Sequence, residues 1–354
     1  MDRTANPEMV VLARQSRGLS QGELALDLGI SQGLISKVEH GATAPTAALI
    51  GELSKRLRYP ASFFYRPEHV RGSDSICFHH RKRTTMPARL LITTEGQMYV
   101  TQLHVRTLLE DLEVAAANHF VTLDPDDFDG NPKTVAQLLR RLWKVPRGPI
   151  TNLVRVIEAA GGVVVFRKFG SAKLDGMSCW PKNCPPLFFI NADIPVDRAR
   201  LTLAHELGHL VMHSHATSSD PEAEANDFAL EFLAPAAEIA PDLRQLRIGQ
   251  LAGLKAHWRI SMNAIVMAAK KSRALPESRI KSLWVQLSQY GYRTSEPFPL
   301  TPEEPQLLGQ AVKVHMDDHG YSAKQLAAMV DLEADEFRSL YLPTQPAQKL
   351  RVLS

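Results

Sequence analysis

The stretch RARLTLAHELGHLVMH, residues 198–213, contains two histidines that flank a glutamate at the spacing of one helical turn. Its leucines recur at helical spacing, so the stretch predicts a helix with an apolar face in a core. Side chains at positions i and i+4 share one face of a helix, so His205 and His209 can hold one zinc ion through their ring nitrogens. Zinc lowers the pKa of a coordinated water to about 7, and Glu206 is placed to take the proton as general base.

A hydrolytic zinc site needs a third protein ligand, and the fourth position stays open for water. Two residues compete for this role. His215 lies where metzincin proteases place their third histidine, but Met212 stands where that motif uses a helix-breaking glycine. Glu222, in the predicted helix PEAEANDFALEFLAP, is the favoured ligand, and Asn226 one turn further on is expected to hydrogen-bond a ligand histidine. Glu224 lies about 200° around that helix from Glu222 and should not share the site.

Three short runs before this helix predict strands at 163–169, 176–180 and 186–192, because they are rich in β-branched and aromatic residues. The second run, GMSCW, could form an edge strand that pairs with an extended substrate peptide. An oxyanion in the transition state would need a hydrogen-bond donor besides zinc. The sequence leaves three candidates open for that donor, His213, His257 and Tyr292, and a structural role remains open for His213.

The N-terminal stretch LSQGELALDLGISQGLISKVEHG, residues 19–41, predicts two short helices joined by a tight turn. Ser20 and Glu23 fit a capping box at the start of the first helix. Gly29 supplies the turn, and Ser31 can cap a second helix that ends at Gly41. Two short helices with a glycine turn form the helix-turn-helix arrangement that places its second helix in the major groove of DNA.

Residues with different roles alternate around this second helix. Ile35 and Val38 are expected to point into the core, and the polar residues lie on the opposite side. A glutamine can bond an adenine edge, a serine can serve several bases, and a lysine suits phosphate. The predicted DNA-binding residues are Gln21, Gln32, Gly33, Ser36 and Lys37.

The composition is that of an ordinary globular protein, with 44% hydrophobic and 22% charged residues among 354. Three cysteines without a CxxC pair favour reduced thiols and argue against a disulfide scaffold, so a cytoplasmic location is expected. No apolar run reaches the ~18–20 residues that span a bilayer, so no membrane association is expected. The net charge of +3 is too small to indicate nucleic-acid binding by itself.

We expect an α+β chain with a domain order that follows these motifs. No internal repeat is apparent, and the basic run HHRKR at 79–83 could grip phosphates or could belong to a solvated linker. The expected parts are an all-α helix-turn-helix domain at 1–68, a linker and helical connector at 69–130, a peptidase domain at 131–270 and a helical region at 271–354.

Two known families share these motifs. The string QGELALDLGISQGLISKVEHG resembles the XRE, or lambda-repressor-like, family of DNA-binding regulators. The strings GPITNLVRVIEAAGGVVV, DGMSCW, RARLTLAHELGHLVMH and EAEANDFALEFLAP resemble the ImmA/IrrE family of metallopeptidases over roughly residues 130–270. This second resemblance implies a gluzincin-like fold with a small sheet packed on the active-site helix. It also implies zinc ligands His205, His209 and Glu222 with Glu206 as base. The family's usual LMP appears here as LAP, at 233–235.

The resemblance also implies a function, because ImmA/IrrE-like peptidases typically cut a partner repressor, often of the XRE type, and so release stress, prophage or mobile-element genes. The first hypothesis is therefore a regulator that binds a DNA operator and cleaves a partner repressor or its own arm near 70–90. The alternatives are a non-proteolytic, zinc-stabilised transcription factor and an antitoxin-like regulator that only holds a partner. A homodimer is expected, because operators for such domains are commonly palindromic.

Overall fold

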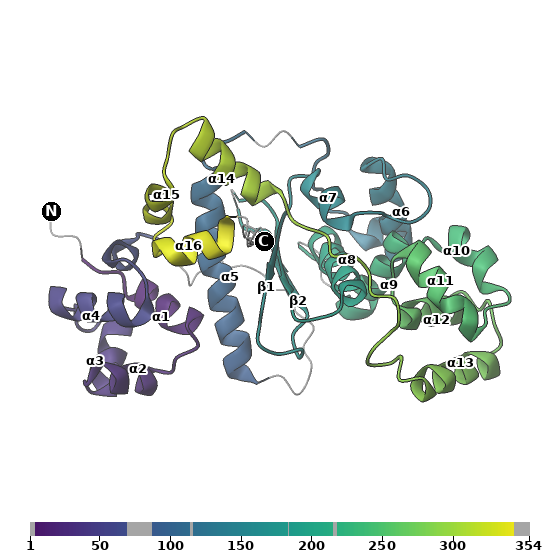
Figure 1. The fold of residues 1–354 in the computed structure, drawn as a ribbon, viewed down its shortest axis with the longest axis horizontal. Coiled ribbons are helices and arrows are strands. Elements are labelled where there is room, and N and C mark those ends of the chain that lie inside the picture. The colour runs from purple at the N-terminus through teal and green to yellow at the C-terminus, as the bar shows by residue number, and fades with distance from the viewer. Residues whose placement is uncertain (1–3, 69–86, 114–115, 183, 215–217, 343–354) are drawn as a thin grey trace, which may run out of the picture. The chain divides into compact units, whose positions relative to one another are not determined.

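The computed structural model describes residues 4–68, 87–113, 116–182, 184–214 and 218–342. They form two compact units (Figure 1). The terminal unit combines 4–68 and 87–113 with 306–342, and the central unit holds the described residues from 116 to 305. The architecture is α+β, with a helix-turn-helix region ahead of a unit that carries one small sheet. The division differs from the expected domains, because residues 271–305 lie in the central unit and residues 306–342 lie in the terminal one.

The N-terminal part of the terminal unit is a cluster of short helices with defined caps. Ser20 and Glu23 form the expected capping box, in which each side chain accepts a hydrogen bond from the other residue's N–H. Gly29 ends the same helix in the left-handed conformation, at φ 66°. The elements are α1 (Pro7–Ser16), α2 (Gln21–Leu28), α3 (Gln32–Glu39), α4 (Ala47–Leu57) and the short 3-10 helix η1 (Ala61–Tyr65).

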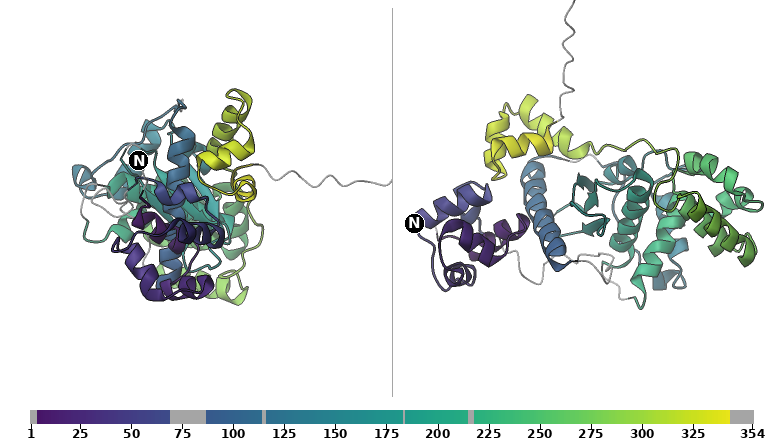
Figure 2. Two further views of the ribbon diagram at one scale, coloured as in Figure 1. Left: turned by 90° about the vertical axis from the view of Figure 1, so that its left-hand side faces the viewer. Right: turned by 60° about the horizontal axis from the view of Figure 1, so that its bottom comes forward.

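The rest of the terminal unit packs around the long helix α5 (Ala88–Leu109), which lies beside α1 (Figure 2). Gly96 permits this approach, because a Cβ there would lie 2.8 Å from the backbone nitrogen of Ser16. From the C-terminal end of the chain, His315 contacts the carbonyl oxygen of Leu108 through Nε2 at 2.9 Å. The C-terminal helices are α14 (Leu307–Asp317), α15 (Ala323–Met329) and α16 (Ala334–Tyr341).

The central unit contains a three-stranded sheet in the order β1-β3-β2. β1 (Val163–Arg167) runs parallel to β3 (Leu187–Asn191), and β2 (Gly176–Cys179) runs antiparallel to β3. All five residues of β3 are buried, which explains the apolar run LFFI, and the buried Asn191 at its end donates to the carbonyl oxygens of Ser171 and Leu174. The three strands fall inside the predicted ranges, and β2 is an edge strand of this sheet.

Helix α8 (Val196–Met212) carries the HELGH motif and packs on β2 and β3. Its leucines Leu203 and Leu207 join Phe188 and Ile190 of β3 in the hydrophobic core. Helix α9 packs on α8, and α6 packs on α9, so the motif helix is enclosed (Figure 1). The other elements of this unit are η2 (Pro125–Phe128), α6 (Pro132–Leu142), α7 (Leu153–Glu158), α9 (Pro221–Leu233), α10 (Ala236–Leu243), α11 (Ile248–Trp258), α12 (Met262–Lys271) and α13 (Glu277–Gln289).

None of the helices in the described part of the chain combines the length and the apolar character that crossing a bilayer requires.

Candidate metal centre and nucleic-acid interface

Helix α8 brings the three polar residues of the HELGH motif to one buried location. His205, Glu206 and His209 have exposed fractions of 5%, 1% and 1%. The Nε2 atoms of His205 and His209 lie 3.0 Å apart, with the two rings nearly perpendicular. One helical turn therefore aims two imidazole nitrogens at the same point, as the i, i+4 spacing predicts.

The neighbouring helix α9 supplies the third member of the cluster. The Glu222 carboxylate lies 3.5 Å from Nε2 of His205 and 3.4 Å from Nε2 of His209. Hydrogen bonding to these imidazoles holds the pKa of the Glu222 carboxyl well below its usual range. The close approach of the two helices depends on Gly208, because a Cβ there would lie 2.9 Å from the ring of Phe228 on α9.

The donor set fits a zinc ion. Ligand atoms of His205, His209 and Glu222 all lie within 4.8 Å of one another. Oε2 of Glu222 is buried, and its contact with Nε2 of His205, at 3.5 Å, is too long for a strong hydrogen bond, so this oxygen can serve as a ligand to a cation. Two imidazoles and one carboxylate form a known three-ligand zinc set that leaves a fourth position open. His215, the competing candidate for third ligand, lies outside the described residues.

A chain of side chains continues from the back of His209. Nδ1 of His209 lies 3.0 Å from Nδ1 of His213, whose Nε2 lies 2.9 Å from the carboxylate of Glu224. Ser218 donates a hydrogen bond to the other carboxylate oxygen at 2.7 Å. A proton on Nδ1 of His209 and one on Nε2 of His213 satisfy both contacts of this chain and leave Nε2 of His209 unprotonated, as metal binding requires. Glu224 thus stays out of the ligand cluster and contacts it through His213.

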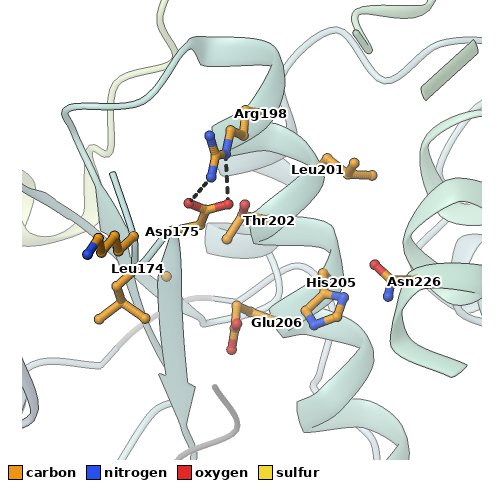
Figure 3. Close-up of a pocket in the computed structure, with 10 residues that line it drawn as sticks. Leu174, Asp175, Arg198, Leu201, Thr202, His205, Glu206 and Asn226 are labelled. Carbon is orange, nitrogen blue, oxygen red and sulfur yellow. Dashed lines mark hydrogen bonds and ion pairs between the residues drawn. The ribbon is translucent and has the colours of Figure 1, made fainter. Parts of the chain in front are cut away.

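Asn226 occupies a different place from the expected one. Its side-chain amide donates to the backbone carbonyl of Glu222 at 2.7 Å, one turn earlier in α9. The side chain also lines the cavity beside His205 (Figure 3). In the described contacts, the carboxylate that reaches behind a ligand histidine is that of Glu224, through His213.

Glu206 faces a serine of the edge strand that the sequence did not single out. Oγ of Ser178 on β2 donates to the Glu206 carboxylate at 2.7 Å. Burial raises the pKa of Glu206 to about 7, although His205 and the Ser178 hydrogen bond act in the opposite direction. The only sign of Ser178 in the sequence is its place within the expected strand GMSCW, next to residues that the fold buries.

A cavity of about 110 Å³ opens beside Glu206 and His205. Figure 3 shows Leu201 and Thr202 on the same helix and Leu174 across the cavity. The Asp175 carboxylate accepts two hydrogen bonds from the Arg198 guanidinium at its rim, at 2.7 and 2.8 Å. Gly176 of β2 lines the cavity as well, so the edge strand borders this space.

The candidate oxyanion donors lie away from this cavity. His213 belongs to the chain behind His209, and neither His257 nor Tyr292 is among the residues that line the cavity. Two of the cysteines, Cys179 and Cys184, are buried and form no disulfide bond within the described residues, and burial raises the pKa of Cys179.

The terminal unit presents a second polar surface, on α3. Ile35 and Val38 are fully buried on its inner side. On the outer side, Gln32, Gly33 and Lys37 are exposed and Ser36 is half-buried. Lys37 and the exposed amide of Gln32 are suited to phosphate and to base edges respectively.

A network of hydrogen bonds holds the N-terminus of α3 against α1 and α2. The Arg14 guanidinium donates to both oxygens of the buried Glu39 carboxylate, at 2.6 and 2.8 Å. The Gln21 amide donates to the same carboxylate, and the Gln32 amide donates to the side-chain oxygen of Gln21 at 2.8 Å. Arg14 and Glu39 escaped the sequence reasoning because they are far apart in the chain and only the fold pairs them. The network fixes the orientation of Gln32 before any ligand arrives.

These features define a protein with a helix-turn-helix DNA-binding domain and a metallopeptidase-like domain. Residues 12–64 match the family model described as helix-turn-helix, and residues 157–270 match the peptidase-family model described as IrrE N-terminal-like domain. No curated protein matches the chain. The chain therefore carries an XRE-type helix-turn-helix region at 12–64 and an ImmA/IrrE-like region at 157–270.

Proposed function

We propose that this protein is a DNA-binding regulator whose central unit is a zinc-dependent endopeptidase. Its substrate is an XRE-type partner repressor or its own arm, and cleavage answers a stress, phage or mobile-element signal. The observation that carries the proposal is the buried carboxylate of Glu206, which lies beside the cluster of His205, His209 and Glu222 and lines a cavity. A purely structural zinc site has no use for a base next to its ligands.

The residues divide the chemistry among them. His205, His209 and Glu222 would hold zinc, which supplies a Lewis acid and a water of lowered pKa. Glu206 takes the proton of the attacking water and delivers it to the leaving amine. Ser178 occupies one carboxylate oxygen of Glu206, which leaves the other oxygen for this proton transfer. The chain through His213 and Glu224 keeps His209 in the tautomer that binds a metal.

The edge strand β2 is suited to hold the substrate. One of its edges pairs with β3, and Met177, Ser178 and Cys179 have no exposed surface, so an extended peptide would add along the other edge only after the groups that cover it have moved aside. Gly176 and Ser178 on this strand border the cavity and contact Glu206 respectively. A peptide laid along β2 would therefore pass the general base, and main-chain pairing suits an unfolded loop of a repressor or an arm of the same chain.

The helix-turn-helix domain would bring this activity to a promoter. Gln32, Gly33, Ser36 and Lys37 would contact the major groove of an operator, with Gln21 holding Gln32 in place. A homodimer would match a palindromic operator.

Cleavage by the wild type and by Glu206→Gln tests the proposal. Both proteins are purified, their zinc is quantified, and each is incubated with operator DNA and the repressor encoded beside it. The variant is expected to keep zinc and DNA binding and to lose cleavage of the repressor or of the arm. Cleavage that persists in Glu206→Gln would remove this residue as the base.

The second candidate is a regulator that binds zinc and a partner protein without cutting it. The small cavity and the deep burial of Glu206 favour this reading, because a peptide bond must reach that carboxylate. One bound zinc with intact wild-type protein and intact repressor under all conditions would support it.

A further inference from the structure

The C-terminal helices repeat the helix-turn-helix of the N-terminus. Helices α15 and α16 begin 302 positions after α2 and α3, as Ser322 follows Ser20, and α14 (Leu307–Asp317) overlaps the range 309–318 that the same offset assigns to α1. No residue has to be inserted or deleted to align them. No internal repeat is apparent in the sequence, and the fold corrects that expectation.

The caps and turns around the second helix agree between the two copies, whereas the Ser31 side chain caps α3 and its counterpart Glu333 makes no such hydrogen bond. Ser20 and Ser322 each open the second helix of their copy with a capping box. The turn before that helix has φ 69° at Gly18 and 72° at Gly320. The turn after it has φ 66° at Gly29 and 53° at Asp331.

The cores of the two copies agree as well. The counterparts Leu24 and Leu326 have no exposed surface, and neither do Ile35 and Phe337. Few of the aligned residues are identical, so the repeat is visible only in the positions of caps, turns and buried side chains. These are the positions that determine a helix-turn-helix fold.

The changes between the two copies include the predicted DNA-reading positions. The counterpart of Gln21 is Ala323, and that of Gln32 is Ala334, so both amides are lost. The counterpart of Gly33 is Asp335, a carboxylate that phosphate would repel. The second copy thus keeps the fold of a DNA reader and lacks its chemistry.

The acidic residues of the second copy bind the first copy instead. Glu336 accepts two hydrogen bonds from the Arg17 guanidinium, at 2.7 and 2.8 Å, and Asp335 pairs with Arg58. Asp331 accepts hydrogen bonds from Ser62 and, at 2.8 Å, from Arg66. The surface that these acids contact, here called the back face, consists of Arg17, Arg58, Ser62 and Arg66.

Other contacts hold the side chains of the back face in place, and the back face does not include α3. Arg17 also donates to the carbonyl oxygen of Leu57 and stacks over the ring of Tyr59, at 4.3 Å from its centre. On α3, Gln32 and Lys37 remain exposed in the presence of the second copy. The contact therefore braces the first copy and leaves its reading residues accessible.

The contact with the back face explains why an aspartate stands at position 331. Its left-handed backbone favours glycine, which the first copy has at the same position. The carboxylate side chain is 10% exposed and bonds two residues of the back face. An aspartate at a glycine position is explained by what its side chain binds.

We propose that residues 307–342 are a second helix-turn-helix that has exchanged DNA for a protein ligand, the back face of the first copy. It holds α1, α4 and η1 in place so that α3 is presented to DNA. The proposal is independent of whether the central unit cleaves anything.

The substitution Asp331→Gly in the full chain tests the proposal, because the two explanations predict different changes in amide hydrogen exchange. The substitution relieves the backbone and removes the carboxylate. If the carboxylate anchors the two copies, amide hydrogen exchange in α1 and η1 accelerates by about tenfold. If the C-terminal helices merely cover a surface, exchange is unchanged or slower, which overturns the proposal. Asp129→Gly is the matched control, because Asp129 has a left-handed backbone at φ 56° in the central unit.

Exchanging the two charges of one ion pair distinguishes the loss of this contact from general unfolding of a variant. Arg17→Glu and Glu336→Arg are each expected to accelerate exchange in α1, and the double variant is expected to exchange more slowly than the sum of the two effects requires. Restoration is partial, because Arg17 also donates to the carbonyl oxygen of Leu57 and stacks over Tyr59. Additive damage in the double variant would contradict a direct contact.

Binding to a mixed-sequence DNA duplex tests the loss of DNA reading. Lys37→Ala is expected to lower the salt slope of binding by about one, as the loss of a phosphate contact does. Lys324→Ala and Arg338→Ala, which remove exposed cations of the second copy, are expected to leave the slope unchanged. A reduction equal to that of Lys37→Ala would show that the second copy binds DNA and would overturn the proposal.

Discussion

At the residue scale, the buried carboxyl of Glu206 gives the metal-free protein a distinct pH dependence. Its pKa is raised from 4.5 to about 7, so the folded state holds a proton that the unfolded chain releases. The resulting stability is present at low pH and is lost as the pH rises from about 4.5 through about 7. The shift corresponds to about 3 kcal/mol of unfolding free energy.

Urea unfolding in the presence of a chelator checks this expectation. Wild type is expected to lose stability relative to Glu206→Gln between pH 5 and pH 8, at about the size given above. Glu333→Gln, which changes an exposed carboxylate, should follow the wild-type curve. Parallel curves for wild type and Glu206→Gln would contradict a raised pKa at this position.

His213 is expected to act on zinc through His209. His213→Gln removes the group between His209 and Glu224, so His209 loses the partner that fixes its tautomer. Loss of such a partner typically costs about 10–100-fold in metal affinity. Competition with a chromophoric chelator measures the change, and His257→Gln, the same substitution at an exposed histidine, serves as the control. Equal zinc affinity in both variants would leave His213 without this role.

At the scale of elements, the distance between α8 and α9 sets the metal centre. Gly208→Ala would drive a methyl group into Phe228 and separate the helix that carries the histidines from the helix that carries Glu222. We expect a loss of about 1–3 kcal/mol in stability from this overpacking, together with weaker zinc binding. Gly253→Ala on α11 meets no atom within 4 Å and is expected to gain up to about 1 kcal/mol.

Thermal unfolding and zinc titration of both variants separate the two effects. A Gly208→Ala protein with wild-type zinc affinity and stability would show that α8 and α9 need no such close approach.

The sequence predicts the contacts between residues that are close together in the chain, and it does not predict those between distant residues. Helix spacing relates His205, Glu206 and His209, and a downstream helix offers Glu222, so these candidates are found locally. Ser178 reaches Glu206 only through the packing of β2 on α8, and no local pattern indicates it. The contact between His213 and Glu224 likewise depends on the packing of α8 on α9. Asn226, which was expected to contact a ligand histidine, instead donates to the carbonyl oxygen of Glu222.

At the scale of the whole molecule, the two sites belong to different units. All three metal-ligand candidates lie in the central unit, and all predicted DNA-binding residues lie in the terminal one. Removal of zinc with a chelator is therefore expected to abolish cleavage and to leave operator affinity unchanged within about twofold, a difference of only about 0.4 kcal/mol. Fluorescence anisotropy with labelled operator, with and without chelator, measures it. A large change in affinity would show that the metal site and the reading helix are coupled.

The expected domain order does not describe how the chain assembles, because residues 306–342 share a unit with residues 4–68 and 87–113. Hydrophobic periodicity shows that residues 307–342 are helical, but it contains no information on which distant segment they pack against. Single ion pairs, such as that between Glu336 and Arg17, join residues 307–342 to the N-terminal helices. The two members of each pair are far apart in the sequence, so the pair can be recognised only in the folded protein.

The terminal unit is made from both ends of one polypeptide, and this has a consequence for self-processing. Hydrolysis of one peptide bond within residues 69–86, which lie outside the described residues, would yield two chains. The smaller chain would still be held by the pairs Arg17–Glu336 and Arg66–Asp331 and by the packing of α1 on α5. A nicked protein would run as two bands on a denaturing gel and elute as one species at low salt. Breaking the bond and releasing the fragment are thus separate events, and dissociation of the fragment would set the duration of any signal.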